Sequence, residues 1–379
     1  MAATSIERIP ERWACSGGCL YEPKWDGFRC IAQVNEDGGV HLWSRRLKRL
    51  NQAFPEIVLA VLGTIPPGTV VDGEIVRWSA DGRLDFSALQ RRHAAGRRRG
   101  GLAVTEPCHY VVFDLLETAG RDLRPAPLSE RRAELEWLFV RVPGTSRVVL
   151  CPQLRDVGEA RLWFEVLVAQ GVEGLVVRAA DGRYLEGRRG WWKVKHRITT
   201  EAIVGGITGT ISEPRSLILG RYSADGMLRV VARSTPLPSA ARAALSRVFT
   251  IVGGDHPWPE VLPASWAGGV PGAGEPIQYT RVLPDVVAEI SVDAAVEHGR
   301  WRHAVAVRAA QAGHTAGRCA LAPRSGMTPI SRQYSTRCLS RVGPAWRQRP
   351  GCERGPGGSV APPPGSPGIL EHMFDQSAV

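Results

Sequence analysis

The chain contains 379 residues, of which 44% are hydrophobic and 22% are charged, a composition typical of soluble globular proteins. Its apolar runs are strand-sized and its N-terminus lacks the apolar region of a signal peptide, so we expect no membrane span, no secretion and a cytoplasmic protein. The formal net charge of +11 favours a polyanionic partner such as nucleic acid, although residues 311–379, with eight arginines against three acids, supply +5 of it.

Residues 20–196 alternate short β-branched runs with amphipathic segments. The runs RCIAQV, VVDGEIVRW, HYVVFDLL and GLVVRAA are bounded by Gly, Asp or Pro and predict buried strands. The segment LSERRAELEWLFV predicts a helix with Ser129 as its N-cap, and VGEARLWFEVLVAQG predicts a second helix that ends at Gly171.

Strands predominate after residue 198. EAIVGGITGT, SLILGRYSADGMLRVVAR and QYTRVLPDVVAEISV predict strands, SADG predicts a hairpin turn, and PSAARAALSRVF predicts one helix. About five strands and a helix in residues 199–310 fit a small oligonucleotide-binding barrel, the OB-fold. From residue 311 the periodicity stops and Pro and Gly make up 19 of 69 residues, against 51 of the preceding 310. We therefore predict a disordered tail over residues 311–379.

The eight cysteines are scattered through the chain. Cys15 and Cys19 form a CxxxC pair, but no second cysteine or histidine pair lies near them in the sequence. Reduced thiols of a cytosolic protein are therefore favoured over a zinc site.

The stretch EPKWDGFRC contains Lys24, one of only four lysines among 48 basic residues. An ammonium group, unlike a guanidinium, can lose its proton and act as a nucleophile. Because an unperturbed lysine has a pKa of about 10.4, this role requires burial or neighbouring cations that lower it. Trp25 and Phe28 offer an apolar setting, which makes Lys24 a candidate nucleophile; a surface lysine before a turn is the alternative.

KWDGFR resembles motif I, KxDGxR, of the covalent nucleotidyltransferases, which comprise ATP-dependent DNA ligases, RNA ligases and messenger-RNA capping enzymes. Later motifs of that superfamily follow in the expected order. SRRLKRLNQAFPEI is similar to motif Ia, VVDGEIV to motif III, VVFDLL to motif IIIa, VEGLVVR to motif IV and WWKVKH to motif V. Six ordered matches are far beyond chance.

The motifs are most similar to those of the small ATP-dependent DNA ligases of bacteria. This resemblance implies an α+β fold, with a nucleotidyltransferase (adenylation) domain of antiparallel sheets over residues 1–198 and an OB-fold over residues 199–310. It also implies ATP and Mg²⁺ or Mn²⁺ as cofactors and nicked double-stranded DNA as the partner. We further expect a monomer that is associated with the nucleoid and recruited by DNA repair proteins.

The resemblance assigns the nucleotide contacts residue by residue. Lys24 would attack the α-phosphate of ATP to form lysyl–AMP. Glu22 would accept a hydrogen bond from the adenine amino group, with a purely structural strand-edge residue as the alternative. Arg29 and Arg45 would bind ribose and phosphate oxygens through their forked donors. Phe113 would stack on the adenine, and it could also be a core residue.

Four further charged residues complete this predicted site. Glu74 and Glu173 are carboxylates at strand positions, and hard oxygen ligands fit Mg²⁺ or Mn²⁺. A ribose contact is the alternative for Glu74. Lys193 and Lys195 alternate along one strand, so both could face the nucleotide phosphates.

The remaining polar residues of these motifs receive other predictions. Asp26 and Asp72, each before a glycine, are predicted to serve turns, with Gly27 and Gly73 supplying a permissive backbone. Lys48 lies in a predicted basic loop. The arginine cluster at residues 90–100 is the stronger candidate for contacts with DNA phosphates.

The resemblance weakens at the end of the predicted barrel. RWRHAVAVRAAQAGHT begins like the family's RxDK-type motif VI, with Arg308 matching its first arginine, but the Asp and Lys are missing. The abrupt change in composition afterwards resembles a changed reading frame. Two other functions stay open: an RNA ligase or capping-type enzyme, which shares most of these motifs, and a non-catalytic nucleic-acid binder that uses the barrel and the arginine clusters.

Overall fold

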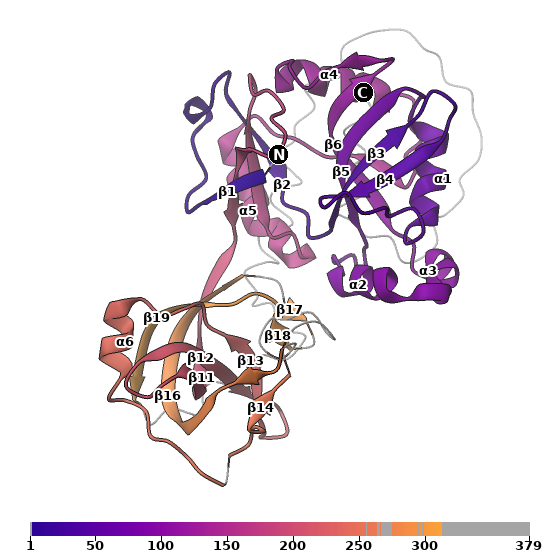
Figure 1. Ribbon diagram of the computed structural model, residues 1–379. Helices are drawn as coiled ribbons and strands as arrows, with labels where there is room; N and C mark the ends of the chain where they lie inside the picture. The colour runs from indigo at the N-terminus through magenta and orange to yellow at the C-terminus, as the bar shows by residue number, and fades with distance from the viewer. Residues whose placement is uncertain are drawn as a thin grey trace, which may run out of the picture.

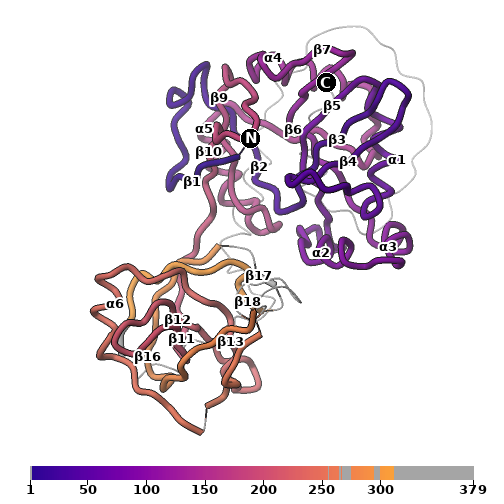
Figure 2. Tube along the Cα trace, in the orientation of Figure 1, coloured from indigo at the N-terminus to yellow at the C-terminus, as the bar shows by residue number. Residues whose placement is uncertain are grey.

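The computed structural model describes residues 2–254, 256–263, 266, 275–293, 296–297 and 299–312. Within these residues the chain forms two lobes and passes from the first to the second at residues 195–197 (Figures 1 and 2). No helix in the described ranges is long and apolar enough to cross a membrane. Of the predicted tail, residues 311 and 312 end a strand, and the rest lies outside the described residues.

The first lobe contains ten strands and five α-helices among the described residues. The strands are β1 (Ala2–Ile6), β2 (Cys19–Pro23), β3 (Phe28–Val34), β4 (Val40–Ser44), β5 (Thr69–Val76), β6 (His109–Thr118), β7 (Arg121–Asp122), β8 (Val148–Leu150), β9 (Gly174–Ala179) and β10 (Arg189–Lys195). The helices are α1 (Pro55–Thr64), α2 (Phe86–Ala94), α3 (Arg99–Thr105), α4 (Leu128–Phe139) and α5 (Val157–Val166), with 3₁₀ turns η1 (Arg12–Ala14), η2 (Gly96–Arg98) and η3 (Leu167–Gln170).

These strands form two sheets, and both sheets are mixed. One has the order β4-β3-β5-β6-β7 with β8 paired to β6, and the other has the order β1-β10-β9-β2. The prediction of purely antiparallel sheets is wrong at two places, since β1 runs parallel to β10 and β8 runs parallel to β6. Parallel partners need a long crossover connection, and α4 lies in the one between β6 and β8.

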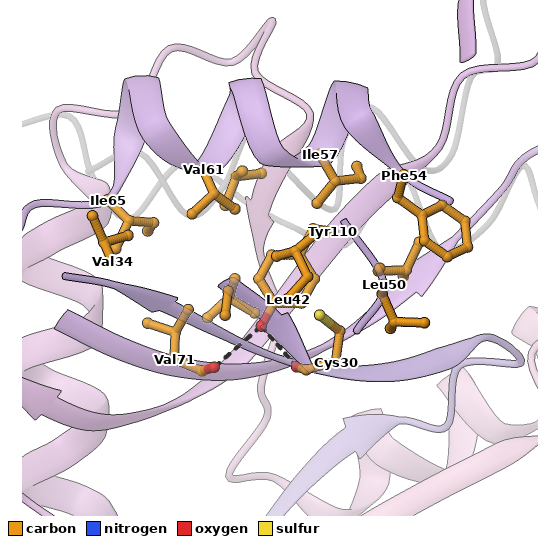
Figure 3. Close-up of a cluster of buried hydrophobic side chains, with 14 of the residues drawn as sticks. Cys30, Val34, Leu42, Leu50, Phe54, Ile57, Val61, Ile65, Val71 and Tyr110 are labelled. Carbon is orange, nitrogen blue, oxygen red and sulfur yellow. Dashed lines mark hydrogen bonds between the residues drawn. The ribbon is translucent and has the colours of Figure 1, made fainter. Parts of the chain in front are cut away.

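The core of the larger sheet lies under α1 (Figure 3). Pro55 begins this helix, where its missing N–H leaves no donor unsatisfied. Ile57 and Val61 of α1 face the sheet and are fully buried. Beneath them, the Tyr110 hydroxyl donates to the carbonyls of Cys30 and Val71 at 2.8 and 3.2 Å, so the buried phenol is satisfied by the two strands it joins.

Of the two residues predicted to mark helix ends, one is wrong and one is confirmed. The helix after the β6–β7 hairpin begins at Leu128 with Pro127 as its cap, so Ser129 is not the N-cap. Its N–H instead donates to the Ala180 carbonyl at 2.8 Å, because the loop at Ala180 lies against the first turn. The prediction for Gly171 is confirmed: it ends η3 in the left-handed conformation, with φ 85°.

The second lobe is built on five long antiparallel strands. Its elements are β11 (Arg197–Gly209), β12 (Pro214–Tyr222), β13 (Leu228–Arg233), α6 (Ser239–Leu245), β14 (Val261–Leu262), β15 (Ile277–Gln278), β16 (Thr280–Asp293), β17 (Val296–Glu297), β18 (Arg300–Trp301) and β19 (Ala306–Ala312). The main sheet has the order β13-β12-β11-β16-β19. A parallel bridge between Ser234 and Val305 connects its two edges, so the sheet closes on itself. The SADG turn joins β12 to β13 as predicted.

Cys15 and Cys19 form a disulfide, which corrects the prediction of reduced thiols for this pair. The turn between them brings the two Cα atoms to 4.9 Å, within the range that a disulfide can span. Cys30, Cys108 and Cys151 are free and buried.

Gly27 and Gly73 serve close packing rather than turns, which corrects their predicted role. Neither has a positive φ, and Gly73 lies within β5. A Cβ at Gly73 would lie 2.5 Å from the Val111 carbonyl oxygen and 2.6 Å from the Tyr110 ring. At Gly27 it would collide with the Ile75 carbonyl oxygen. Any larger residue would therefore collide with its neighbours at the position after each aspartate.

We predict that Gly73→Ala destabilises the protein by about 1–3 kcal/mol, because backbone and the buried Tyr110 ring must both move. Gly63→Ala is the matched control: Gly63 lies in α1, and a Cβ added there would meet nothing within 4 Å, so alanine should stabilise by up to about 1 kcal/mol. Urea unfolding measures both, and an unchanged midpoint for Gly73→Ala would contradict the packing argument.

Candidate active site

Lys24 lies at the junction of the two sheets of the first lobe, directly after β2. Its N–H donates to the Gly174 carbonyl at 2.8 Å, and its carbonyl accepts from the Glu173 N–H at 3.0 Å. These backbone hydrogen bonds bring motifs I and IV together. As a result the Lys24 amine forms a salt bridge with the buried carboxylate of Glu173. Trp25 is buried beside them and donates its indole N–H to the Cys151 sulfur at 3.3 Å.

The pKa of Lys24 is raised, whereas its apolar neighbours in the sequence led us to expect a lowered pKa. Burial favours the neutral amine, but the negative charges of Glu173, Glu74 and Asp26 together outweigh it. The nucleotide-free protein therefore holds Lys24 in its protonated form.

Glu74 faces the same space from β5, where it pairs in register with Arg29 of β3. Its removal from water raises its pKa to about 8, and the carboxylates of Asp72 and Asp26 add to this, while Lys24 and Arg29 oppose it. Burial is therefore the main reason that Glu74 favours its neutral form, and the nearby cations offset it only in part. A divalent cation would favour the ionised form of this carboxylate, so Glu74 is chemically suited to the predicted metal.

Arg29 uses its forked donors within the protein. It donates to both oxygens of Asp72, at 3.0 and 2.5 Å, and to the Tyr184 hydroxyl at 3.2 Å. Asp72 is completely buried within β5, so its predicted role in a turn is wrong. A buried carboxylate at this position needs a charged partner, and Arg29 provides it.

Phe113 and Trp191 form an aromatic pair between the sheets. Their ring centroids lie 5.8 Å apart in an edge-to-face arrangement, and Phe113 is 9% exposed. The guanidinium groups of Arg29 and Arg178 lie 4.9 and 5.0 Å from the Trp191 ring centroid. Phe113 is thus part of the core, as the alternative interpretation had it, and it borders the polar residues of the site.

Glu22 is buried, with only 3% of its surface exposed. Its Oε1 accepts from the Gln153 side-chain amide at 2.7 Å and from Arg178 at 2.5 Å. Sequence reasoning assigned no role to Arg178, although it is the last residue of the VEGLVVR motif. Its carboxylate partner could not be identified without the pairing of β2 with β9.

Lys193 and Lys195 lie two residues apart on β10, as predicted. Lys195 contacts Glu173 at 3.3 Å and Asp293 of the second lobe at 3.2 Å. Burial lowers the pKa of Lys193, and the nearby Lys24, Lys195 and Arg45 charges act in the same direction. Arg45 itself lies in the exposed turn after β4, so the structure places it at the rim of the site.

Arg302 of the second lobe reaches into this site, and sequence reasoning missed it. Its Nη2 donates to Asp26 at 2.7 Å and to Glu173 at 3.3 Å, and its guanidinium lies 4.0 Å from the centroid of the Phe86 ring. Asp26 therefore serves an ion pair between the lobes rather than the predicted turn. Arg308, the expected motif VI arginine, is an exposed residue of β19. The other positions of an RxDK motif, counted from Arg308, are Ala309, Ala310 and Gln311 on the same strand.

A second cluster of potential metal ligands lies between the lobes. Ligand atoms of Glu173, Asp293 and His303 all lie within 4.8 Å of one another, and the His303 ring contacts Asp293 at 2.8 Å. Lys195 already contacts both carboxylates here. Glu173 therefore belongs both to this cluster and to the salt bridge with Lys24.

The arginine cluster at residues 90–100 divides into structural and exposed members. Arg92 is buried and forms a salt bridge with Glu56, which removes it from any contact with DNA. Arg91, Arg97 and Arg98 are exposed on α2 and η2. Lys48 is exposed as well. Burial and the positive charges of Arg99 and Lys48 lower the pKa of His93 of α2.

These charges predict an order of lysine reactivity in the nucleotide-free protein. Only the unprotonated amine reacts with acetic anhydride, so Lys193, with its lowered pKa, should be acetylated faster than Lys24, with its raised pKa. As the pH is raised, Lys193 labelling should increase first and Lys24 labelling later. Peptide mass spectrometry after brief labelling measures both, with the exposed Lys48 as internal reference. Faster labelling of Lys24 would contradict this electrostatic picture.

Comparison with known proteins identifies the family. A model of the ATP dependent DNA ligase domain matches residues 1–195. DNA ligase C2 of Mycolicibacterium smegmatis is 35% identical over 320 residues, covering 80% of this chain and 87% of the relative. DNA ligase C of Mycobacterium tuberculosis is 32% identical over 328 residues with the same coverage. The solved ligase domain from M. tuberculosis LigD is 25% identical, covering 84% of this chain and 97% of its own, with a TM-score of 0.44. The chain therefore belongs to the ATP-dependent DNA ligases, as a small bacterial member.

Proposed function

We propose that Lys24 is the nucleophile with which this ligase takes AMP from ATP, and that the AMP then passes to the 5′-phosphate at a nick in duplex DNA. The 3′-hydroxyl finally displaces AMP and seals the strand. The observation that carries this proposal is the convergence of Lys24, Lys195 and Arg302 on the single carboxylate of Glu173. Phosphoryl transfer is catalysed mainly by positioning and charge, and this site concentrates both.

Lys24 must lose its proton before it can attack. In the nucleotide-free protein Glu173 holds that proton in place through the salt bridge. When the carboxylates around Lys24 are neutralised, the main influence that raises its pKa is removed. Burial then favours the neutral amine, and the repulsion between Lys24 and Lys193 acts in the same direction.

Glu74 and Glu173 would hold the Mg²⁺ or Mn²⁺ ion. When bound, such an ion would neutralise these carboxylates and the negative charge of the triphosphate. The raised pKa of Glu74 supports this assignment, because burial disfavours the ionised carboxylate and a bound cation would stabilise it.

The adenosine would lie between the two sheets of the first lobe. Glu22 would accept from the adenine amino group and Phe113 would stack on the base. Arg29, held by Asp72, would bind the ribose, and Arg45 the phosphates from the rim. Lys193 and Lys195 would bind phosphate oxygens from β10, which requires Lys195 to release Asp293.

We assign an adenylation domain and an OB-fold domain, which the sequence placed at residues 1–198 and 199–310; β11 of the second lobe begins slightly earlier, at Arg197, and β19 ends slightly later, at Ala312. The closed five-stranded sheet and α6 support the OB-fold assignment. Nicked DNA would contact the exposed arginines of α2 and η2, on the side of the first lobe that faces the second (Figure 1). The enzyme would act as a monomer at the nucleoid, in the repair of broken strands and with repair proteins as its recruiting partners.

We predict that Lys24→Arg abolishes the covalent AMP adduct and sealing from ATP, because a guanidinium keeps the charge but cannot act as a nucleophile. Sealing of a nick that already carries 5′-AMP should persist at a reduced rate, since the adduct step is bypassed. Mass spectrometry of the protein after incubation with ATP and Mg²⁺ detects the adduct directly.

Lys48→Arg, in an exposed loop, is the matched control and should form the adduct like the unmodified enzyme. Assays with ATP, GTP and NAD, on nicks with and without ribonucleotides, separate this function from an RNA ligase or a capping-type enzyme. An adduct that survives in Lys24→Arg would overturn the assignment of the nucleophile.

A further inference from the structure

We propose that Arg178 is a positioning residue for base selection: it fixes the Glu22 carboxylate and Phe113 so that the site accepts adenine. The inference rests on the proposed nucleotide-binding role of Glu22. Arg178 lies on β9, beside β2, where it pairs in register with Leu20. Glu22 is two residues further along β2 and therefore on the same face of this sheet.

Arg178 leaves one oxygen of Glu22 available. Both hydrogen bonds that Glu22 accepts within the described chain, from Arg178 and Gln153, end on Oε1. No donor from the described residues contacts Oε2. A carboxylate that is paired with a guanidinium accepts hydrogen bonds and donates none. Such an oxygen matches the amino group of adenine and mismatches the 6-oxo group of guanine or hypoxanthine.

The same guanidinium also fixes the aromatic side of the site. Its Nη2 donates to the Phe113 carbonyl at 2.6 Å, and its Nη1 donates to Asp114 at 2.8 Å. Both partners belong to β6 of the other sheet. Arg178 thus connects the strand that carries Glu22 to the strand that carries Phe113. Arg178 thereby sets the distance between Glu22, which would bind the edge of the base, and Phe113, which would stack on its face.

The energetics of this network indicate a role beyond stability. Arg178 is 1% exposed and its charge is balanced by Glu22 and Asp114, while Arg131 binds Asp114 through two hydrogen bonds. Buried ion networks often stabilise a protein no better than apolar residues of similar volume. The Nε of Arg178 is buried without an acceptor among the described residues, which is unfavourable. The geometry therefore favours correct placement of Glu22 over maximal stability.

Arg178→Lys tests this role, because lysine keeps the charge but lacks the planar donors that reach Glu22, Asp114 and the Phe113 carbonyl together. The readout is the ratio of kcat/KM for Lys24 adduct formation with ATP to that with purine riboside triphosphate, which lacks the amino group. Both substrates are measured on the same sample, so a partly unfolded fraction cancels. We expect the ratio to fall by about 10-fold or more relative to the unmodified enzyme, mainly through KM for ATP.

Arg131→Lys is the matched control. Arg131 is equally buried and bonded to the same Asp114, but its hydrogen bonds within the described chain go to Asp114 and to the carbonyls of Ala126 and Gly182, away from Glu22. This variant should therefore keep the ratio of the unmodified enzyme. Gln153→Ala, which removes the other hydrogen bond to Oε1, should lower the ratio in the same direction as Arg178→Lys.

The outcomes separate this inference from the proposed function. An unmodified enzyme that forms no Lys24 adduct with either triphosphate would overturn the proposed function. An adduct that forms equally well with both would remove the role of Glu22, and with it that of Arg178. A normal preference in the unmodified enzyme that is retained by Arg178→Lys, or lost equally in Arg131→Lys, would overturn the positioning role alone.

Discussion

The ion pair between Lys24 and Glu173 is the constraint on which the rest of the site depends. Two backbone hydrogen bonds place these residues side by side, and the carboxylate then attracts Lys195 and Arg302 as well. The amine that we propose as the nucleophile is thus kept protonated in the nucleotide-free protein. Under the proposed function, Lys24 would become reactive only after the carboxylates around it are neutralised.

The scarcity of lysine follows from the same chemistry. Arginine serves wherever a cation must stay charged, as in the buried pairs of Arg29 with Asp72 and of Arg92 with Glu56. Lysine is retained at positions 24, 193 and 195, where a change in protonation or a compact charge is useful. If the proposed roles of these lysines hold, the choice of residue separates permanent structural charges from those that take part in the reaction.

Local patterns predicted much of the fold. The strands that became β3, β5, β6 and β9 and the SADG hairpin follow from alternation and turn residues, which depend on neighbours in the sequence. Two kinds of feature were beyond this reasoning. Parallel pairing of β1 with β10 joins residues far apart in the chain. Similarly, Asp26 and Asp72 resembled turn residues because their partners, Arg302 and Arg29, become neighbours only after folding.

The candidate site shows the same division. The motifs supplied its first members, but the partners that hold them, such as Arg178 and Arg302, were visible only in three dimensions. The sequence could also not predict whether the pKa of Lys24 is raised or lowered, since this depends on how many carboxylates surround the amine. Motif spacing indicates which groups meet, whereas the balance of charge among them is a property of the assembled structure.

The crossing between the lobes has a consequence for how they can separate. Only His196 lies between β10 and β11, and its N–H donates to the Glu173 carbonyl, so His196 would stay with the first lobe if the second lobe moved away. In that motion Arg302 would leave Asp26 and Glu173, and Lys195 would leave Asp293. Separation of the lobes at this site would therefore break the ion pairs of two cations, and because these pairs are largely buried, added salt would weaken them less than it weakens exposed pairs.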